Sequence, residues 1–527
     1  MRKIFRLWML LVPMALGIAS CSDNDDNPVT PPEPDKPATE LADYAILFYG
    51  HGGGNLDEAI LTNIAQFYMA DEESYEKVKI AVQYKYSSVE NLLDNIKDID
   101  EEEAKAMGGK TVRFVVDPTE DLEDDDDGEE HLYGESNADI TCPDSLTNFI
   151  NWSAKACPAK NYILLLSDHG GGYMPQDDLP YTPSAAPTRA IIFDDGNDGK
   201  GFTIKSLAAA ISAADIRPQV IYMDACLMNS VEYQFELKDL ADYLVLSTFT
   251  VPGFGGNYIS LVNELAQNSD IETALARFCK TSVEAWDVQC KDIFGDNLYH
   301  DMTITRTSAL NTFGEKWKEF TNRLIDGYQN GGAEVKAAID EVTENYTFKI
   351  DNERPEYDLT NYVRAMCQNV PSYFPEAFVN ELGTAFDNCI VYQQSSDYLE
   401  QNDWEVDCSI LLGAKGHYTV YEWDGEEGGD WVLQLILEFQ TDGTIGIYDS
   451  ERTLYGYAPW KSTFADTYEQ LAFDRLTGWS RWIKLNEQEP AAYSPATMML
   501  SLFDVDYEYD GETVTVVSRR PKKYIKY

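Results

Sequence analysis

Two segments place a reactive side chain directly after an apolar run. Residues 161–173 read NYILLLSDHGGGY, with His169 followed by three glycines, and residues 220–239 begin VIYMDACLMNSVE, with Cys226 after a second such run. A thiol that attacks a carbonyl needs a base near the sulfur, donors that face the developing oxyanion, and surroundings that favour the thiolate. The two segments therefore predict a cysteine nucleophile, Cys226, served by a general base, His169.

The elements that must position these side chains follow the pattern of an α/β sandwich with a largely parallel sheet. Apolar runs predict strands at 44–49, 78–84, 111–116, 162–166, 220–223 and 243–246, and amphipathic stretches predict helices at 56–69, 145–156 and 204–214. Because the carboxyl ends of parallel strands meet at one edge of a sheet, we expect His169 and Cys226 to meet there. Cys226 is also expected to begin a helix that reaches Leu240, and a helix start favours the thiolate.

Donors for an oxyanion are available from the backbone. Gly170 has no side chain, so its N–H can approach a substrate closely, and the amide of Cys226 is the expected second donor. No residue can be assigned as an orienter of His169, since Asp168 is its sequence neighbour and neighbours generally point apart.

These residues resemble the clostripain family of cysteine endopeptidases, in the caspase–gingipain–legumain group, which is marked by a strand ending in His-Gly and a later strand ending in Ala-Cys. The similarity extends to residues 145–172, 236–248, 357–363 and 476–483. It implies a caspase-like α/β/α sandwich and a dyad that needs no metal or organic cofactor. We expect a catalytic core at 43–270 and a helical continuation at 271–400. A β-rich region is expected at 401–527, because residues 423–447 and 504–519 alternate in the manner of strands. His51, in YGHGGGNLDEA, also precedes glycines, but its flanking sequence does not match the segment of the base.

The resemblance also implies substrate-binding residues. Family members cleave after Arg or Lys and use acidic residues near the nucleophile, and Asp224 matches one of these. Ser247 and Phe254 are the other predicted substrate-binding positions. Phe254 stands in the loop Val251–Gly256 where a second acid is expected, which weakens a basic preference and leaves a neutral or apolar residue before the cut as the alternative.

Protein or peptide substrates are the expected partners. Family members can be precursors that cut themselves into two chains, but none of the four basic residues between His169 and Cys226 stands out as a processing site; they are Arg189, Lys200, Lys205 and Arg217. A catalytically retired surface protein that binds peptide or glycan is the alternative function, motivated by Phe254 and Gly256. A transpeptidase that uses the same covalent intermediate is a third reading.

The amino terminus predicts export. A basic start and an apolar run end in Ile18-Ala19-Ser20-Cys21, which resembles the lipobox of bacterial lipoproteins, so residues 1–21 are expected to be a signal peptide with Cys21 as the lipidation site. The Pro- and Asp-rich residues 22–42 predict a tether. The expected location is the outer membrane, on the cell surface, with a periplasm-facing protein as the alternative.

Composition narrows the partners further. The chain has 91 acidic and 40 basic residues and a formal net charge of −51, which repels nucleic acid and anionic lipid, so we expect membrane contact through the lipid anchor only. None of the histidines or cysteines has zinc-ligand spacing. The acidic runs at 120–130 and 194–199 lack the ligand pattern of an EF-hand, so calcium is unsupported.

Overall fold

The computed structural model describes residues 41–97, 99–118, 139–173, 191–197, 200–294, 299–343, 350, 356–402, 406–412, 417–423, 431–439, 444–449, 453–459, 468–486, 503–509 and 514–521. The predicted signal peptide, the lipidation site Cys21 and the acidic run at 120–130 lie outside these residues. Within them, no helix is long and apolar enough to cross a membrane. The eight cysteines that follow Cys21 are all free thiols, so this part of the fold does not depend on disulfides.

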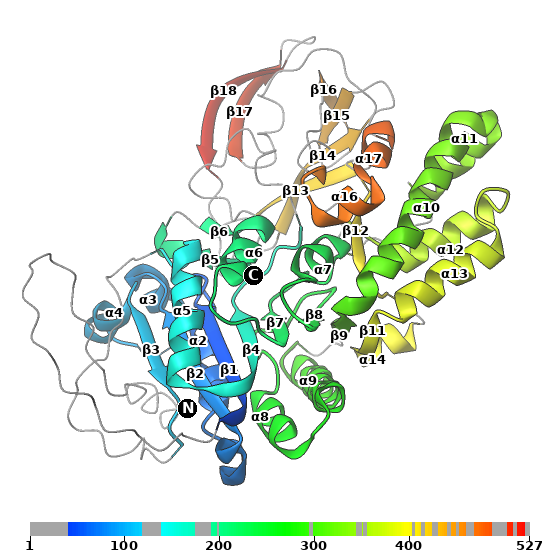
Figure 1. Cartoon of the computed structure of the whole chain (residues 1–527). Coiled ribbons are helices and arrows are strands. Elements are labelled where there is room, and N and C mark those ends of the chain that lie inside the picture. Colours follow the sequence, from blue (N-terminus) through cyan, green and yellow to red (C-terminus); the bar gives the residue numbers. More distant parts are fainter. Residues whose placement is uncertain are drawn as a thin grey trace, which may run out of the picture.

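One eight-stranded sheet organises the molecule, in the order β11-β9-β8-β7-β4-β1-β2-β3 (Figure 1). Its five central strands run parallel, and antiparallel strands form both edges. The bounds are β1 Ala42–His51, β2 Val78–Lys85, β3 Thr111–Val115, β4 Ala159–Ser167, β7 Val220–Asp224, β8 Tyr243–Leu246, β9 Asp301–Arg306 and β11 Ile390–Ser395. The predicted α/β fold with a largely parallel sheet is confirmed.

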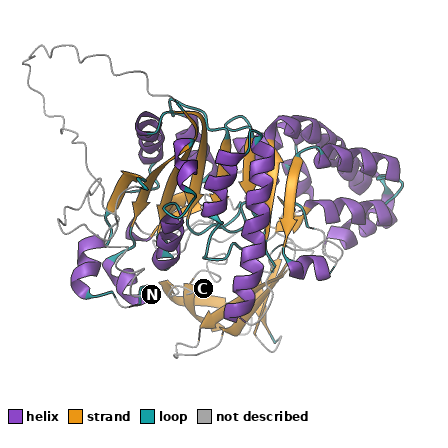
Figure 2. Cartoon of the chain, turned by 90° about the horizontal axis from the view of Figure 1, so that it is seen from below, coloured by secondary structure: helices purple, strands orange, loops and turns teal. Residues whose placement is uncertain are grey.

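The central strands are apolar because both of their faces are covered. Ile163 to Leu166 of β4 are fully buried, as expected for a parallel strand between two layers of helices. Alternate side chains enter different cores: Leu164 and Leu166 join one apolar cluster, whereas Ile163 and Leu165 join the other. The sheet thus separates two hydrophobic cores, and Figure 2 shows the helices on both of its sides.

The helices divide between these two cores. The first core is covered by α5 Pro143–Ala156, α6 Ile204–Ser212 and α7 Val231–Leu237. The second is covered by α2 Asp57–Gln66, α3 Val89–Asn95, α4 Glu101–Met107, α8 Tyr258–Gln267 and α9 Ile271–Phe294. The strands and helices predicted up to residue 250 all occur, within a few residues of their expected bounds, except for the helix after Cys226.

Beyond residue 270 the chain contributes more than helices. Strands β9 and β11 complete one edge of the main sheet, so the sheet does not end within residues 43–270. The helices here are α10 Leu310–Asn330, α11 Gly332–Glu341, α12 Leu359–Asn369, α13 Glu376–Asp387 and α14 Asp397–Gln401, and two short helices follow later, α16 Ala472–Thr477 and α17 Ser480–Asn486. Trp317 of α10, Trp482 of α17 and Trp479, directly before α17, are fully buried in the first core, which extends over this region.

The remaining strands are short or lie near the carboxyl end. Strands β5 Ile191–Asp194 and β6 Lys200–Phe202 form an antiparallel pair, as do β10 Glu356–Asp358 and β12 Ser409–Leu411. A four-stranded antiparallel sheet follows, made of β13 His417–Trp423, β14 Trp431–Phe439, β15 Thr444–Asp449 and β16 Leu454–Pro459. The last pair is β17 Phe503–Tyr509 and β18 Val514–Pro521. Strands β13 to β18 lie within the range where a β-rich region is expected, and the helices α16 and α17 lie there too.

Candidate active site

Cys226 lies two residues beyond the end of β7, half-buried, at the carboxyl edge of the parallel strands. Its Sγ accepts a hydrogen bond from the Val251 N–H at 3.3 Å. The next residue, Leu227, has a left-handed backbone with φ 64°, and its N–H donates to the Phe249 carbonyl at 2.9 Å. The chain after Cys226 is therefore tied to the segment that follows β8.

The predicted helix start at Cys226 is wrong. Helix α7 begins only at Val231, where the Ser230 side chain accepts a hydrogen bond from the Tyr233 N–H and caps it. Between the two, the Asn229 N–H donates to the Ser247 carbonyl at 2.8 Å, and Leu227 has a left-handed backbone that a helix does not allow. The argument that a helix terminus favours the thiolate of Cys226 therefore fails.

His169 follows β4, the strand that pairs with β7. The carboxyl of Asp168 holds this turn, because its Oδ1 accepts from the His169 N–H at 2.6 Å and its Oδ2 accepts from the Phe193 N–H at 2.7 Å. The His169 carbonyl in turn accepts from the Ile192 N–H. Strand β5 thus fixes the backbone of His169 through Asp168.

Gly170 brings the two predicted catalytic segments into contact. A Cβ at this position would lie 2.2 Å from the carbonyl oxygen of Cys226 and 2.7 Å from its nitrogen. No side chain fits such a gap, so the backbones after β4 and β7 touch only because residue 170 is glycine. The structure therefore places His169, Gly170 and Cys226 together at one sheet edge, as the topology predicted.

Asn55 is a neighbour of His169 that the sequence did not reveal. Its Oδ1 lies 2.6 Å from His169 Nε2, although the two residues are 114 positions apart. Asn55 ends the glycine run after β1, and the same loop brings Gly53 against the ring, where a Cβ would lie 2.7 Å from His169 Cδ2. The one available signal was the polar residue directly after the glycines in GHGGGN.

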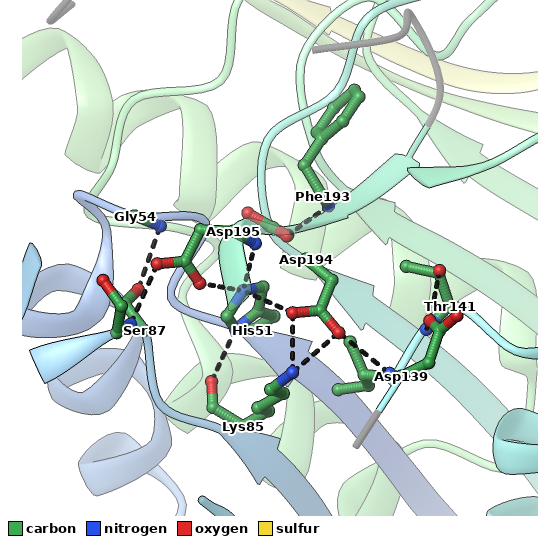
Figure 3. A network of polar contacts seen from close by, with 12 residues as sticks. His51, Gly54, Lys85, Ser87, Asp139, Thr141, Phe193, Asp194 and Asp195 are labelled. Carbon is green, nitrogen blue, oxygen red and sulfur yellow. Dashed lines mark hydrogen bonds and ion pairs between the residues drawn. The ribbon is translucent and has the colours of Figure 1, made fainter. Parts of the chain in front are cut away.

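His51 is buried and belongs to a polar network that also includes Gly54 of this loop (Figure 3). Its Nδ1 lies 2.8 Å from the Lys85 carbonyl oxygen and its Nε2 lies 2.9 Å from Asp195 Oδ1. Lys85 Nζ lies 2.6 Å from Asp194 Oδ1, and both side chains are fully buried. His51, Asp194 and Asp195 are close enough to share a metal ion, but the Lys85 ammonium already supplies the positive charge on Asp194.

Burial and this network set the charges around the site. Burial alone would lower the pKa of His51, but the hydrogen bond to Asp195 and the charges of Asp168 and Asp194 raise it to about 9. Burial raises the pKa of Asp168 to about 8. Burial, together with the nearby His51, lowers the pKa of His169 to about 4. His169 is thus a neutral imidazole at neutral pH, which is the form that accepts a proton.

The three predicted substrate-binding residues lie in different surroundings. Asp224 is buried at the end of β7, and its Oδ2 accepts from the Gly256 N–H at 3.0 Å and the Tyr258 hydroxyl at 2.5 Å. Ser247 is buried and bonds to Asp301 and to the Phe249 carbonyl. Phe254 is half-buried and packs on the second core.

Comparisons with known proteins identify the family of this chain. The model of the clostripain family matches residues 68–424. Clostripain from Hathewaya histolytica is 25% identical over 238 residues, which are 42% of this chain and 41% of that protein. The chain thus matches about two fifths of the length of this curated relative.

One solved structure supports the fold, and a second is reported beside it. A secreted C11 cysteine protease from Bacteroides thetaiotaomicron, in complex with an irreversible peptide inhibitor, is similar with a TM-score of 0.50 and 15% identity, over 84% of this chain and 100% of that one. A structure of a secreted C11 cysteine protease from the same organism, named iotapain, covers 68% of this chain and 88% of its own, with a TM-score of 0.49 and 17% identity.

The contact at Gly170 predicts the effect of adding one methyl group. In Gly170→Ala the new Cβ must push the Cys226 backbone away, and a displacement of about 1 Å at a reactive centre costs on the order of 100-fold in rate. We expect iodoacetamide to alkylate Cys226 at least about tenfold more slowly, as measured by mass spectrometry of the modified peptide. Gly383→Ala is the control, because nothing lies within 4 Å of a Cβ there. Equal rates in both variants would contradict the close contact.

The His51 network predicts a pH-dependent stability. The pKa of His51 in the folded chain is about 9, above the ordinary histidine value of about 6.5. The stabilisation by its charged form is therefore complete below about pH 6.5 and is lost as the pH rises through about 9. Across this range we expect the difference in unfolding free energy between the native chain and His51→Gln to shrink by about 3 kcal/mol, from urea denaturation.

A surface ion pair gives the control for that experiment. Lys105 and Glu101 are both well exposed, so Lys105→Gln should change the unfolding free energy little, by about 0–1 kcal/mol, with no trend between pH 6.5 and 9. Parallel curves for His51→Gln and the native chain would show that His51 carries no extra proton in the folded state.

Proposed function

Because the chain belongs to the clostripain family, we propose that it is a cysteine endopeptidase with Cys226 as nucleophile and His169 as general base. The observation that carries the proposal is the backbone contact between Gly170 and Cys226, where a Cβ would lie 2.2 Å from the Cys226 carbonyl oxygen. It holds a neutral imidazole and a half-buried thiol at the same sheet edge, which is the requirement for thiol attack.

The reaction uses groups of this chain and a water molecule. Cys226 Sγ attacks the scissile carbonyl carbon and its proton passes to His169, which then donates that proton to the leaving amine as the C–N bond breaks. A thioester on Cys226 remains. Water attacks the thioester while His169 takes the water proton, the C–S bond breaks, and the proton returns to the sulfur. These steps require no metal or organic cofactor.

The backbone supplies the donors for the tetrahedral oxyanion. The turn after β4 pairs with β5 through a hydrogen bond from the Ile192 N–H to the His169 carbonyl. This bond does not use the Gly170 N–H. The Gly170 and Cys226 amides are close together, because a Cβ on Gly170 would lie 2.7 Å from the Cys226 nitrogen. Two amides aimed at a developing negative charge are worth several kcal/mol of transition-state stabilisation, roughly 3–4 kcal/mol for each donor.

Asp224 supports a preference for Arg or Lys before the cut. Its Oδ2 is engaged by Gly256 and Tyr258, whereas its buried Oδ1 makes no hydrogen bond of ordinary geometry within the described part of the chain, with the Tyr222 hydroxyl close by. Burial raises the pKa of Asp224, so a cationic substrate side chain would stabilise its charged form. Phe254 packs on the core and adds no carboxylate. We assign the preference for a basic residue before the cut to Asp224 alone. Ser247 bonds to Asp301, which accepts hydrogen bonds from the Thr248 and Phe249 N–H groups, and so supports the loop after β8.

The export signals complete the proposal. The lipobox-like residues 18–21 assign acylation to Cys21, and the Pro- and Asp-rich residues 22–42 serve as the tether of an outer-membrane lipoprotein that faces the cell surface. The four basic residues between His169 and Cys226 are the positions at which the proposed basic preference would allow the chain to cut itself, and none of them is singled out.

Digestion of a diverse peptide mixture tests the enzymatic proposal. A soluble chain that begins at Leu41 should cut after Arg and Lys, and Cys226→Ala should abolish cutting, a loss of more than about 1,000-fold, because the nucleophile is absent. Mass spectrometry of the products gives both the rate and the residue before the cut. Cys367→Ala, a half-buried cysteine of α12, should retain the native rate.

Each outcome of this digestion has a distinct meaning. Cuts after neutral residues that vanish in Cys226→Ala would overturn the role of Asp224 but keep the peptidase. No cutting by the native chain, even after trypsin nicks it, would overturn the peptidase and favour a retired protein that binds peptide or glycan. Products joined to an added amine would indicate transpeptidation.

Metabolic labelling tests the anchor. In cells fed an alkyne fatty acid, the full chain should carry the label and sediment with membranes, whereas Cys21→Ala should lose the label and leave the membrane fraction, because acyl chains hold the protein by burial of methylene groups. Cys142→Ala is the control. Full labelling of Cys21→Ala would rule out the lipobox assignment, and accessibility to added protease distinguishes the cell surface from the periplasm.

A further inference from the structure

The imidazole of His169 is held from one side by the loop between β1 and α2. Asn55 Oδ1 lies 2.6 Å from Nε2, and Gly53 lies against Cδ2, the ring atom next to Nε2. The loop therefore covers the Nε2–Cδ2 edge of the ring. The other nitrogen, Nδ1, lies on the opposite edge and is the one left to serve the thiol.

The loop that carries Asn55 is itself anchored. The Gly52 N–H donates to the Lys85 carbonyl at 3.2 Å, the Gly54 N–H donates to Ser87 Oγ at 2.9 Å, and Asn95 Nδ2 donates to the Gly54 carbonyl at 2.7 Å. Gly53 and Gly54 have positive φ angles of 56° and 89°, which glycine adopts without cost. Such a loop keeps its last residue, Asn55, in one place relative to the sheet edge.

We propose that Asn55 is a positioning residue for His169, which fixes the ring orientation and the tautomer with the proton on Nε2. An amide oxygen can only accept a hydrogen bond, so its contact with Nε2 requires the proton there and leaves Nδ1 unprotonated. The ring then presents its basic nitrogen to Cys226 before substrate arrives. The inference rests on the proposed function, because it assigns a role to Asn55 within that dyad.

The side chain next to Nε2 is an amide and not a carboxylate, and this difference affects the charge of His169. A carboxylate next to Nε2 would stabilise the imidazolium, whereas the neutral Asn55 orients the ring without that charge. Two titratable side chains lie near His169: Asp168, whose carboxyl accepts from the His169 N–H, and His51 of β1, which is paired with Asp195 and lowers the pKa of His169. The positive charge of His51 disfavours a second cation at His169, and this agrees with a base that rests in its neutral form.

Three substitutions at position 55 test the proposal by kinetics. Asn55→Leu removes the acceptor, and we expect kcat for a peptide substrate to fall by about 10–100-fold with little change in KM, because only the reacting geometry is affected. Asn55→Ser shortens the side chain and should resemble Asn55→Leu. Asn55→Asp keeps an acceptor and should recover most of kcat. Asn268→Ala, a half-buried asparagine remote from the site, is the control and should be unchanged.

Histidine-selective ¹⁵N NMR provides a readout that does not depend on peptide cleavage. The chain has five histidines, so the signals of His169 can be assigned with His169→Gln. We expect the native protein to show the Nε2–H tautomer, Asn55→Leu to show a mixture of tautomers, and Asn55→Asp to raise the pKa of His169 by about 1–3 units.

The two readouts separate the possible failures. An inactive native chain that shows the expected tautomer and its loss in Asn55→Leu would overturn the proposed function but keep the Asn55–His169 contact. Native kcat in Asn55→Leu, or an unchanged tautomer, would overturn the positioning role. A fall in kcat with native NMR signals for His169 would also count against it, since the loss would then come from elsewhere.

Discussion

The site depends on one close approach of two backbones, at the turn after β4 and the turn after β7. Gly170 lies against the carbonyl and amide of Cys226, where no Cβ fits. This contact sets the distance between the strand that delivers His169 and the strand that delivers Cys226. Because both strands are buried on both faces, neither can shift to compensate, and the geometry of the site follows from the packing of the sheet.

A second layer of polar contacts holds His169 from behind. Strand β5 fixes its backbone through Asp168, and β5 is fixed in turn by the ion pair of Lys85 with Asp194. Ion pairs this deeply buried add little net stability, since the cost of removing the charges from water offsets their attraction. Their geometry is strict, however. Here the pair of Lys85 with Asp194 joins β2 to β5, and the pair of His51 with Asp195 joins β1 to the residue after β5. Asn55 and Asp168 therefore reach His169 from a common support.

The sequence predicted the features that depend on local pattern and on topology. The apolar runs of β4 and β7, the parallel order and the meeting of His169 with Cys226 all follow from burial on both faces and from the rule for strand ends. It missed features that depend on distant partners. Asn55 reaches His169 only through the turn made by Gly53 and Gly54, and Cys226 does not begin a helix because Leu227 takes a left-handed backbone tied to Phe249. Strands β9 and β11 escaped notice because their sequences, DMTITR and IVYQQS, are of mixed polarity and lack a continuous apolar run.

The charges around the dyad favour one of two ways to activate a thiol. A cysteine and histidine can rest as a thiolate–imidazolium pair, or as neutral groups that transfer the proton during attack. Here burial lowers the pKa of His169, the nearby His51 is positively charged, and the group on Nε2 is a neutral amide. Each of these disfavours imidazolium, and α7 begins too far along the chain for its terminus to stabilise a thiolate at Cys226. His169 therefore rests as a neutral imidazole, so in the proposed dyad the proton of Cys226 would pass to it during the attack on the substrate.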